Sequence, residues 1–169
     1  IPGYSSFVDK NWKNMAIFYV AIAPEGVGKI RTLPYFKDPF VSYNLTLNDR
    51  INLALGLKDL CKMLLNANAK QILPSIIDSN IITKNKDIEN LPKIINSKKS
   101  NLFSVHLFSS CPIGDNVEKC AADSTGKVYG HKNLYVCDSS TIPSATGVNP
   151  QGPLMYLTYN FLEMFKKDL

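Results

Sequence analysis

The sequence predicts an α+β fold: an antiparallel sheet with covering helices, followed by a C-terminal strand-loop-helix segment. Three observations lead to it. Short apolar runs separated by Pro and Gly fill the first 45 residues, a pattern typical of a β-meander. Apolar residues at helical spacing then follow over about 47–67, and this predicts a long amphipathic helix. The last third changes to a continuous apolar run, a loop and a second helix, which indicates a different layer of structure.

The composition predicts a globular chain with few of the features that mark nucleic-acid or membrane proteins. With 169 residues, 45% of them hydrophobic, the chain can bury a core as one domain or parts of two. Its net charge of +5 is scattered, without clustered basic and aromatic residues, so we expect no nucleic-acid partner. The apolar run Met15 to Pro24 is too short to span a bilayer. We therefore expect no membrane anchor in a soluble chain, cytoplasmic rather than secreted.

The cysteines and histidines do not form a metal-site pattern. The four cysteines show no C-x-x-C spacing, and only two histidines accompany them, so we expect no metal site. Cys61 and Cys137 lie in apolar patterns and are expected to be small core residues. The sequence leaves a disulfide between Cys111 and Cys120 open.

The first part of the chain predicts three antiparallel strands, over residues 14–23, 28–33 and 40–45. Pro24-Glu-Gly26 ends the first run, and Pro34 and Asp38-Pro39 separate the other two. Gly26-Val-Gly28 begins like a dinucleotide-binding loop, but the third glycine is missing and a strand follows instead of a helix. We interpret it as a hairpin turn.

A long helix is predicted over about 47–67, with its N-terminus at a capping box. Thr46 and Asp49 have the spacing of that motif. The residues on the predicted apolar face are Leu47, Ile51, Ala54, Leu57, Cys61 and Leu64. We expect this face to pack on the meander. Residues 70–77 predict one more strand, and the polar stretch 78–101 predicts a surface with a short helix around Lys86 to Ile95.

The closing third predicts a strand over 133–138 and a terminal helix. The strand is a continuous apolar run ended by Asp138, a pattern typical of burial on both faces. The helix is expected to begin at Asn149 as N-cap and Pro150 as first residue. Its inward stripe comprises Leu154, Leu157, Phe161 and Phe165, and Lys166 and Lys167 complement its dipole. A strand, a loop and a helix N-terminus in this order favour anion binding.

Three motifs in this closing third resemble the glucose-methanol-choline (GMC) flavoprotein oxidoreductases. They are His106-Leu-Phe-Ser-Ser-Cys111-Pro-Ile-Gly114, Val128-Tyr-Gly130-His-Lys-Asn133-Leu134-Tyr-Val136-Cys-Asp138-Ser-Ser140-Thr-Ile-Pro143 and Gly147-Val-Asn149-Pro150-Gln-Gly152. The family pattern has Gly, Thr and Met where this chain has Ser109, Ser110 and Ile113. The segment Asp38-Pro39-Phe-Val41-Ser-Tyr43-Asn-Leu45-Thr46 is also similar to the family's substrate domain.

The resemblance implies a division at about residue 104. Residues 1–104 would form the substrate-binding domain. Residues 105–169 would carry the catalytic motif and return to an FAD-binding α/β domain. No Gly-x-Gly-x-x-Gly loop is present, and the chain starts at Ile1 without an initiator Met. We therefore expect the C-terminal portion of an enzyme whose FAD-binding N-terminal portion is missing, with a trimmed mature N-terminus as the alternative account of the start.

The resemblance gives His106 the role of catalytic base. Oxidation of an alcohol or sugar CH–OH group removes the hydroxyl proton while a hydride passes to FAD, and a neutral imidazole is suited to accept that proton. Without the motif, a lone histidine would be read as a core or surface residue. His131 lies in a turn at a position that varies in the family, and we expect it at the surface.

The remaining expected site residues surround the flavin. Asn149 would hydrogen-bond the substrate oxygen as negative charge develops, and its alternative role is a helix cap. Pro150, Gln151 and Gly152 would bring the positive helix end to the flavin ring. Asp138, with Ser139 and Ser140, would bind the cofactor near its ribityl or pyrophosphate part, or serve only as a turn cap. The alternative functions are a non-redox flavoprotein of lyase or photodecarboxylase type and a non-catalytic relic binding domain.

Overall fold

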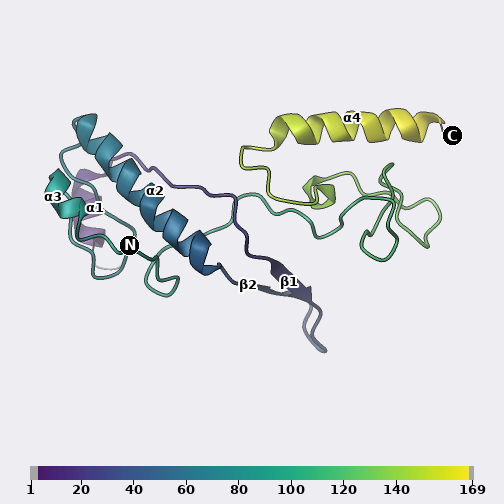
Figure 1. Cartoon of the computed structure of the whole chain (residues 1–169), viewed down its shortest axis with the longest axis horizontal. Coiled ribbons are helices and arrows are strands. Elements are labelled where there is room, and N and C mark those ends of the chain that lie inside the picture. The colour runs from purple at the N-terminus through teal and green to yellow at the C-terminus, as the bar shows by residue number, and fades with distance from the viewer. Residues whose placement is uncertain (1–3, 168–169) are drawn as a thin grey trace. The chain divides into compact units, whose positions relative to one another are not determined.

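The computed structural model describes residues 4–167 and divides the chain into two compact units. Unit 1 comprises Ile1–Lys29 and Val41–Phe103, and unit 2 comprises Ile30–Phe40 and Ser104–Leu169. The elements form a small α+β structure with one two-stranded antiparallel sheet (Figure 1). The assignment of the two parts to substrate binding and to flavin binding stays a prediction.

Unit 1 begins with a short helical segment that the sequence analysis did not predict. Helix α1 covers Ser5–Asn11 and continues as a 3-10 turn, η1, over Trp12–Asn14. The Tyr4 hydroxyl donates a hydrogen bond to the carbonyl of Ser79. This bond ties the start of the described chain to a loop 75 residues later.

The predicted meander is reduced to a hairpin. Strand β1, Gly28–Arg31, pairs with β2, Phe40–Tyr43, as predicted for those runs. The predicted strand over 14–23 is wrong, because in residues 4–167 no strand pairs with this segment. It runs instead beside a helix, where a Cβ added to Gly56 would lie 2.6 Å from the Val20 methyl carbon Cγ1. The glycine allows this close approach.

Helix α2, Leu47–Asn66, confirms the long helix and its capping box. The Asp49 amide donates to Thr46 Oγ1 (3.1 Å), and the Thr46 amide donates to Asp49 Oδ2 (2.8 Å). The amides of Glu25 and Gly26 also donate to the Asp49 carboxylate, at 2.8 and 3.1 Å. Asp49 is 1% exposed, so this buried carboxylate joins the start of α2 to the irregular segment before β1. The hairpin turn predicted at Gly26-Val-Gly28 is wrong, because no strand precedes β1 in the described residues.

The apolar face of α2 does not pack on the sheet, contrary to expectation. Its buried Cys61 lies in a core cluster with Ile82, Ile88 and Leu91. Ile88 closes the four-residue helix α3, Asn85–Ile88, which lies beside α2 (Figure 1). Leu47 stays exposed. A two-stranded hairpin offers too little apolar surface to cover a 20-residue helix, and the later loop covers it instead.

The predicted elements between α2 and the closing third are shorter than expected. Residues 70–77 form single antiparallel bridges, Ile72 to Ile82 and Ile76 to Ser100, rather than a strand. The helix expected from Lys86 to Ile95 is limited to α3. Ile95 and Arg50 instead exchange bonds: the Ile95 amide donates to the Arg50 carbonyl (3.1 Å), and Arg50 Nε donates to the Ile95 carbonyl (2.5 Å).

Unit 2 combines irregular segments with one helix. The strand predicted over 133–138 is wrong: its one bridge joins Tyr135 to Lys127, and Cys137 is exposed rather than buried. The Val136 amide donates to the Gly126 carbonyl (2.9 Å). No partner strand for this run lies within residues 4–167, so the local apolar pattern does not become a ladder.

Helix α4 covers Gln151–Lys167 and begins one residue later than predicted. The Pro150 carbonyl accepts the first helical hydrogen bond, from the Leu154 amide at 2.8 Å, which makes Pro150 rather than Asn149 the N-cap. Phe161 of the predicted inward stripe is buried, and Leu154 and Leu157 are half-buried. Phe165 is 39% exposed, contrary to the prediction, although its ring meets Tyr135 edge-on at 5.1 Å between centroids. No helix in the described part of the chain is long and apolar enough to cross a membrane.

Candidate active site

Two of the three motifs lie side by side in unit 2. The Cys111 amide donates to the Ser140 carbonyl (3.1 Å), and the Ile113 amide donates to the Thr141 carbonyl (3.4 Å). Ser139 Oγ donates to the Leu107 carbonyl at 3.2 Å. These three bonds hold the segment that follows His106 against the turn that follows Asp138, although about 30 residues separate them in the sequence.

Asp138 caps the short 3-10 turn η2, Ser139–Thr141. Its Oδ1 accepts a hydrogen bond from the Ser140 amide at 2.7 Å, and its carbonyl accepts one from Thr141 Oγ1 at 2.7 Å. Hydrogen bonds from the Ser140 side chain and amide lower the pKa of Asp138 below its ordinary value and outweigh the opposing effect of burial. The carboxylate is exposed, so one of its oxygens organises the turn while the group faces solvent.

His106 is exposed in the irregular segment between Ser104 and Phe108. Its ring lies 6.1 Å from the Phe108 ring, at an interplanar angle of 38°. The imidazole thus lies near one aromatic ring while the residue is accessible to solvent. His131, the second histidine, is also exposed, as predicted for a turn residue.

The third motif forms the N-terminal end of α4. Asn149 is exposed and Pro150 is buried, and Gln151 and Gly152 are exposed in the first turn. A Cβ added to Gly152 would meet no atom within 4 Å, so the space beside this turn is open. Pro153 lacks an N–H, which leaves the amides of Gln151 and Gly152 as the donors at the positive helix end.

The structure connects only part of the predicted site. Hydrogen bonds join the His106 segment to the Asp138 turn, but among residues 4–167 none joins Asn149 to His106 or Asp138. Two surface hollows lie beside α2 and α3 in unit 1, and none of the predicted catalytic residues lines them. His106, Asp138 and Asn149 are each exposed at the surface of unit 2.

The sequence analysis missed the residues that support these motifs. Tyr129 donates its hydroxyl to the Gly114 carbonyl at 2.8 Å and so fixes the end of the His106 motif. Gly114 has φ +156°, and a Cβ there would lie 2.8 Å from Cys120 Sγ. Thr141 is fully buried. Tyr129 and Thr141 both lie within the second motif, and their position in that motif is the one feature of the sequence that could have indicated these roles.

The cysteines and acids of the described chain do not form a metal centre. No cluster of three or more His, Cys, Asp or Glu suited to a metal ion occurs within residues 4–167. Cys111 and Cys120 are half-buried free thiols in the structure, and Cys61 is a buried one, as predicted. Burial raises the pKa of the Cys61 thiol, consistent with a core rather than a reactive residue.

Comparison with known proteins agrees with the motif arrangement. The family model described as GMC oxidoreductase matches residues 24–158. An uncharacterized GMC-type oxidoreductase, y4nJ of Sinorhizobium fredii, is 39% identical over 153 residues, which is 90% of this chain and 30% of that protein. The long-chain-alcohol oxidase FAO1 of Arabidopsis thaliana is 29% identical over 169 residues, 90% of this chain and 22% of the relative.

A third kind of relative matches over a shorter part of the chain. A cholesterol oxidase of Acinetobacter baumannii is 38% identical over 48 residues, 28% of this chain and 9% of that protein. The chain thus spans less than a third of the length of the relatives it matches.

Proposed function

The chain belongs to the GMC oxidoreductase family, and on that premise we propose that it forms part of an FAD-dependent enzyme that oxidises the CH–OH group of an alcohol or sugar. His106 is the base that accepts the hydroxyl proton, and Asn149 hydrogen-bonds the substrate oxygen. The observation that carries the proposal is the set of three hydrogen bonds that holds the exposed His106 segment against the Asp138 turn.

The residues at the α4 end fit a flavin. The amides of Gln151 and Gly152 carry the positive helix end, the space beside Gly152 is open to 4 Å, and Asn149 stands exposed next to them. A positive helix end stabilises negative charge on a bound ring. FAD, when bound, supplies the hydride acceptor. Asp138, Ser139 and Ser140 are the residues of this chain that would bind the ribityl or pyrophosphate part of the cofactor.

The role proposed for His106 is to accept a proton at an accessible ring nitrogen. A neutral imidazole accepts a proton at physiological pH, whereas the amide of Asn149 cannot act as an efficient base and contributes hydrogen bonding alone. General-base catalysis of this kind contributes about 10²- to 10⁴-fold to a rate. The rest of the substrate site would be formed by the portion of the GMC proteins that this chain does not span.

Long-chain alcohols are the first substrates to test. The Arabidopsis relatives FAO1 and FAO3, at 29% and 27% identity, are named long-chain-alcohol oxidases. Sugars and choline-like donors complete the panel. With the full-length protein, anaerobic bleaching of flavin absorbance by one of these donors is the expected result. Bound flavin that no donor bleaches would contradict the redox assignment and favour a lyase or photodecarboxylase.

The role of His106 is tested by His106→Ala in the same full-length protein. We expect flavin to be retained and the rate of flavin reduction to fall about 10²- to 10⁴-fold, because the proton acceptor is lost. The matched control is His131→Ala, which removes the chain's other histidine from an exposed turn and should leave the rate unchanged. An unaltered rate in His106→Ala would exclude the base role.

A further inference from the structure

A surface groove runs along helix α2 in unit 1, and its lining contains none of the predicted site residues. Two adjoining hollows, of about 510 and 470 Å³, share the lining residues Asn66 and Asn85. We call them together the α2–α3 groove. The residues of its lining used below are Lys58, Lys62, Asn66, Lys70, Lys84 and Asn85.

The walls of this groove are held rigidly. Helix α2 ends with the Asn68 backbone at φ 65°, and the Ala69 amide donates to the Leu64 carbonyl at 2.9 Å, which is a Schellman closure. On the other wall, Asp87 Oδ2 accepts bonds from the amides of Thr83 (2.9 Å) and Lys84 (3.2 Å). The groove is therefore present before any partner binds, which limits the entropy cost of binding.

The charge of the lining is strongly one-sided. Four lysines line the groove, and Glu89 is the acid among its lining residues. Lys62 also contacts Asp59 at 3.3 Å, but both side chains are more than half exposed, and such pairs contribute little. Asp87 has its carboxylate engaged by its own turn. The groove presents net positive charge to a partner.

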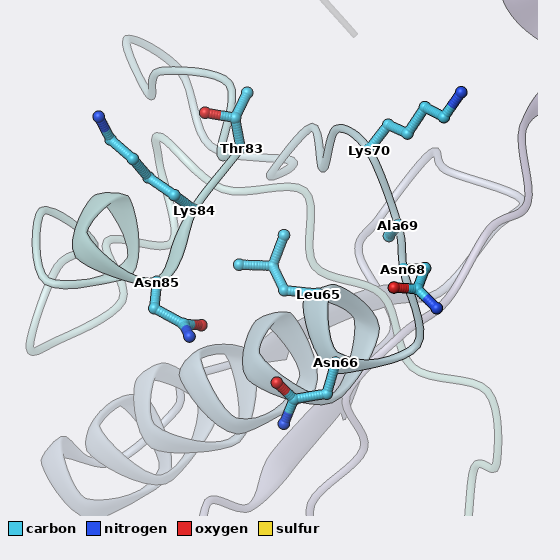
Figure 2. A pocket seen from close by; sticks show the side chains of 8 residues that line it. All are labelled: Leu65, Asn66, Asn68, Ala69, Lys70, Thr83, Lys84 and Asn85. Carbon is cyan, nitrogen blue, oxygen red and sulfur yellow. The ribbon is translucent and has the colours of Figure 1, made fainter.

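The arrangement of the side chains excludes a single small anion. Figure 2 shows the Lys70 and Lys84 side chains at the rim with their ammonium ends pointing outward and away from each other, while Leu65 lies between them. The nearby C-terminal end of α2 carries partial negative charge. Separate cations around an amide-lined and partly apolar floor suit a longer partner whose acidic groups are spaced apart.

The chemistry of the floor favours a peptide. Asn66 and Asn85 each offer an amide donor and an acceptor, as an extended backbone requires, and the half-buried Leu65 adds apolar contact. From Lys58 to Asn66 the helix rises about 12 Å, the length of about four extended residues. The lining contains neither arginine nor an aromatic residue, the groups that nucleic-acid surfaces use.

We propose that the α2–α3 groove is a docking site for an extended acidic segment of another protein. The polar lining distinguishes this groove from the apolar surfaces of the chain. A face of lysine and asparagine is suited to contact with water, so we expect it to stay accessible in a longer polypeptide. This inference does not depend on the proposed oxidation of alcohols.

The test uses the full-length protein and a fluorescein-labelled peptide, Glu-Glu-Leu-Glu-Glu, followed by fluorescence anisotropy. We expect saturable binding that weakens about tenfold between low and physiological salt, because exposed charges are screened. The matched peptide Gln-Gln-Leu-Gln-Gln should not bind. Equal binding of both peptides, or no binding of either, would overturn the proposal.

Charge-reversal variants locate the site. Lys58→Glu and Lys84→Glu should each weaken binding about tenfold, whereas Lys119→Glu, an exposed lysine of unit 2, should change it less than twofold. Lys84→Gln gives a milder variant, and circular dichroism checks that each variant is folded. The same loss in all variants would overturn the site, and so would tighter binding of a thymidine oligonucleotide than of the acidic peptide.

Discussion

The carboxylate of Asp49 connects three backbone segments of unit 1. Burial alone raises the pKa of this group, but hydrogen bonds from the amides of Glu25, Thr46 and Gly26 and from the Thr46 hydroxyl outweigh it, so the pKa lies below its ordinary value. Ionised Asp49 therefore stabilises the folded state. That contribution is complete above the ordinary pKa of about 4 and is lost as the pH falls through the lower folded-state value.

Asp49→Asn is expected to destabilise the protein at neutral pH by about 1.5–3 kcal/mol, because the uncharged amide cannot accept all of these hydrogen bonds. The measurement is urea unfolding of wild type and variant at pH 7 and at acidic pH. The difference between the two proteins should shrink as the acid protonates Asp49 in the wild type. A difference that stays constant with pH would contradict the assignment to this carboxylate.

The matched control is Asp59→Asn on the same helix. Asp59 is 76% exposed at its side chain and contacts Lys62 at 3.3 Å, so its loss should cost less than about 1 kcal/mol. A cost as large as that of Asp49→Asn would mean that a negative charge elsewhere on α2 contributes as much as the hydrogen-bonded carboxylate of Asp49.

Single residues differ in how much of their role the sequence reveals. Thr46 and Asp49 were predicted as a capping box because that motif is local and its spacing is fixed, but the bonds from Glu25 and Gly26 join distant segments and leave no such spacing. His106 and Asp138 were recognised through motifs. Their proximity depends on Ser139 and Leu107, which no periodicity connects.

The amphipathic pattern of helix α4 correctly predicted the burial of Phe161. Its stripe predicted Phe161 at the interior, and that side chain is 7% exposed, against the Gly126 backbone. Gly126 has φ +82°, and a Cβ there would lie 3.3 Å from two carbons of the Phe161 ring. The glycine thus provides both the turn and the space for the ring.

Phe161→Ala should destabilise unit 2 by about 3–5 kcal/mol, since it removes a buried ring and leaves a cavity. Thr158→Ala, at an exposed position on the same helix outside the predicted stripe, should cost less than about 0.5 kcal/mol. Thermal unfolding followed by circular dichroism compares the two. Equal costs would show that α4 does not bury the predicted face.

Three strand predictions failed, over residues 14–23, 70–77 and 133–138, and the first and last of them failed for the same physical reason. Residues 14–23 and 133–138 are apolar and β-prone, but a strand forms only where another backbone supplies its hydrogen bonds. Within residues 4–167 the one ladder of strands is β1 with β2. Helices satisfy their own hydrogen bonds, and for this reason α2 and α4 were predicted to within a residue or two, whereas only β1 and β2 of the predicted strands are formed.

The chain as a whole leaves much of its large apolar surface exposed. On α4, a second face formed by Met155, Tyr156, Tyr159 and Leu162 is 50–67% exposed. The hairpin turn exposes Tyr35 and Phe36. A helix that is apolar on two faces is typical of a buried position, and soluble monomers rarely expose contiguous apolar patches of this kind. The relatives contain at least twice as much additional polypeptide as this chain supplies, which is sufficient to cover such faces.

We expect the 169-residue chain on its own to self-associate and to bind the dye ANS, because its exposed α4 face favours any apolar partner. Light scattering coupled to size-exclusion chromatography, with ANS fluorescence, measures both effects. Replacing Met155, Tyr159 and Leu162 by Ser, Thr and Gln should reduce both, whereas Met63→Ser is the control, because Met63 is 57% exposed on α2 beside Asp59 and Asn66. A monomeric, ANS-negative wild-type chain would contradict this reading of the α4 face. In the full-length protein the same three replacements should instead lower stability, since there the face is covered rather than free.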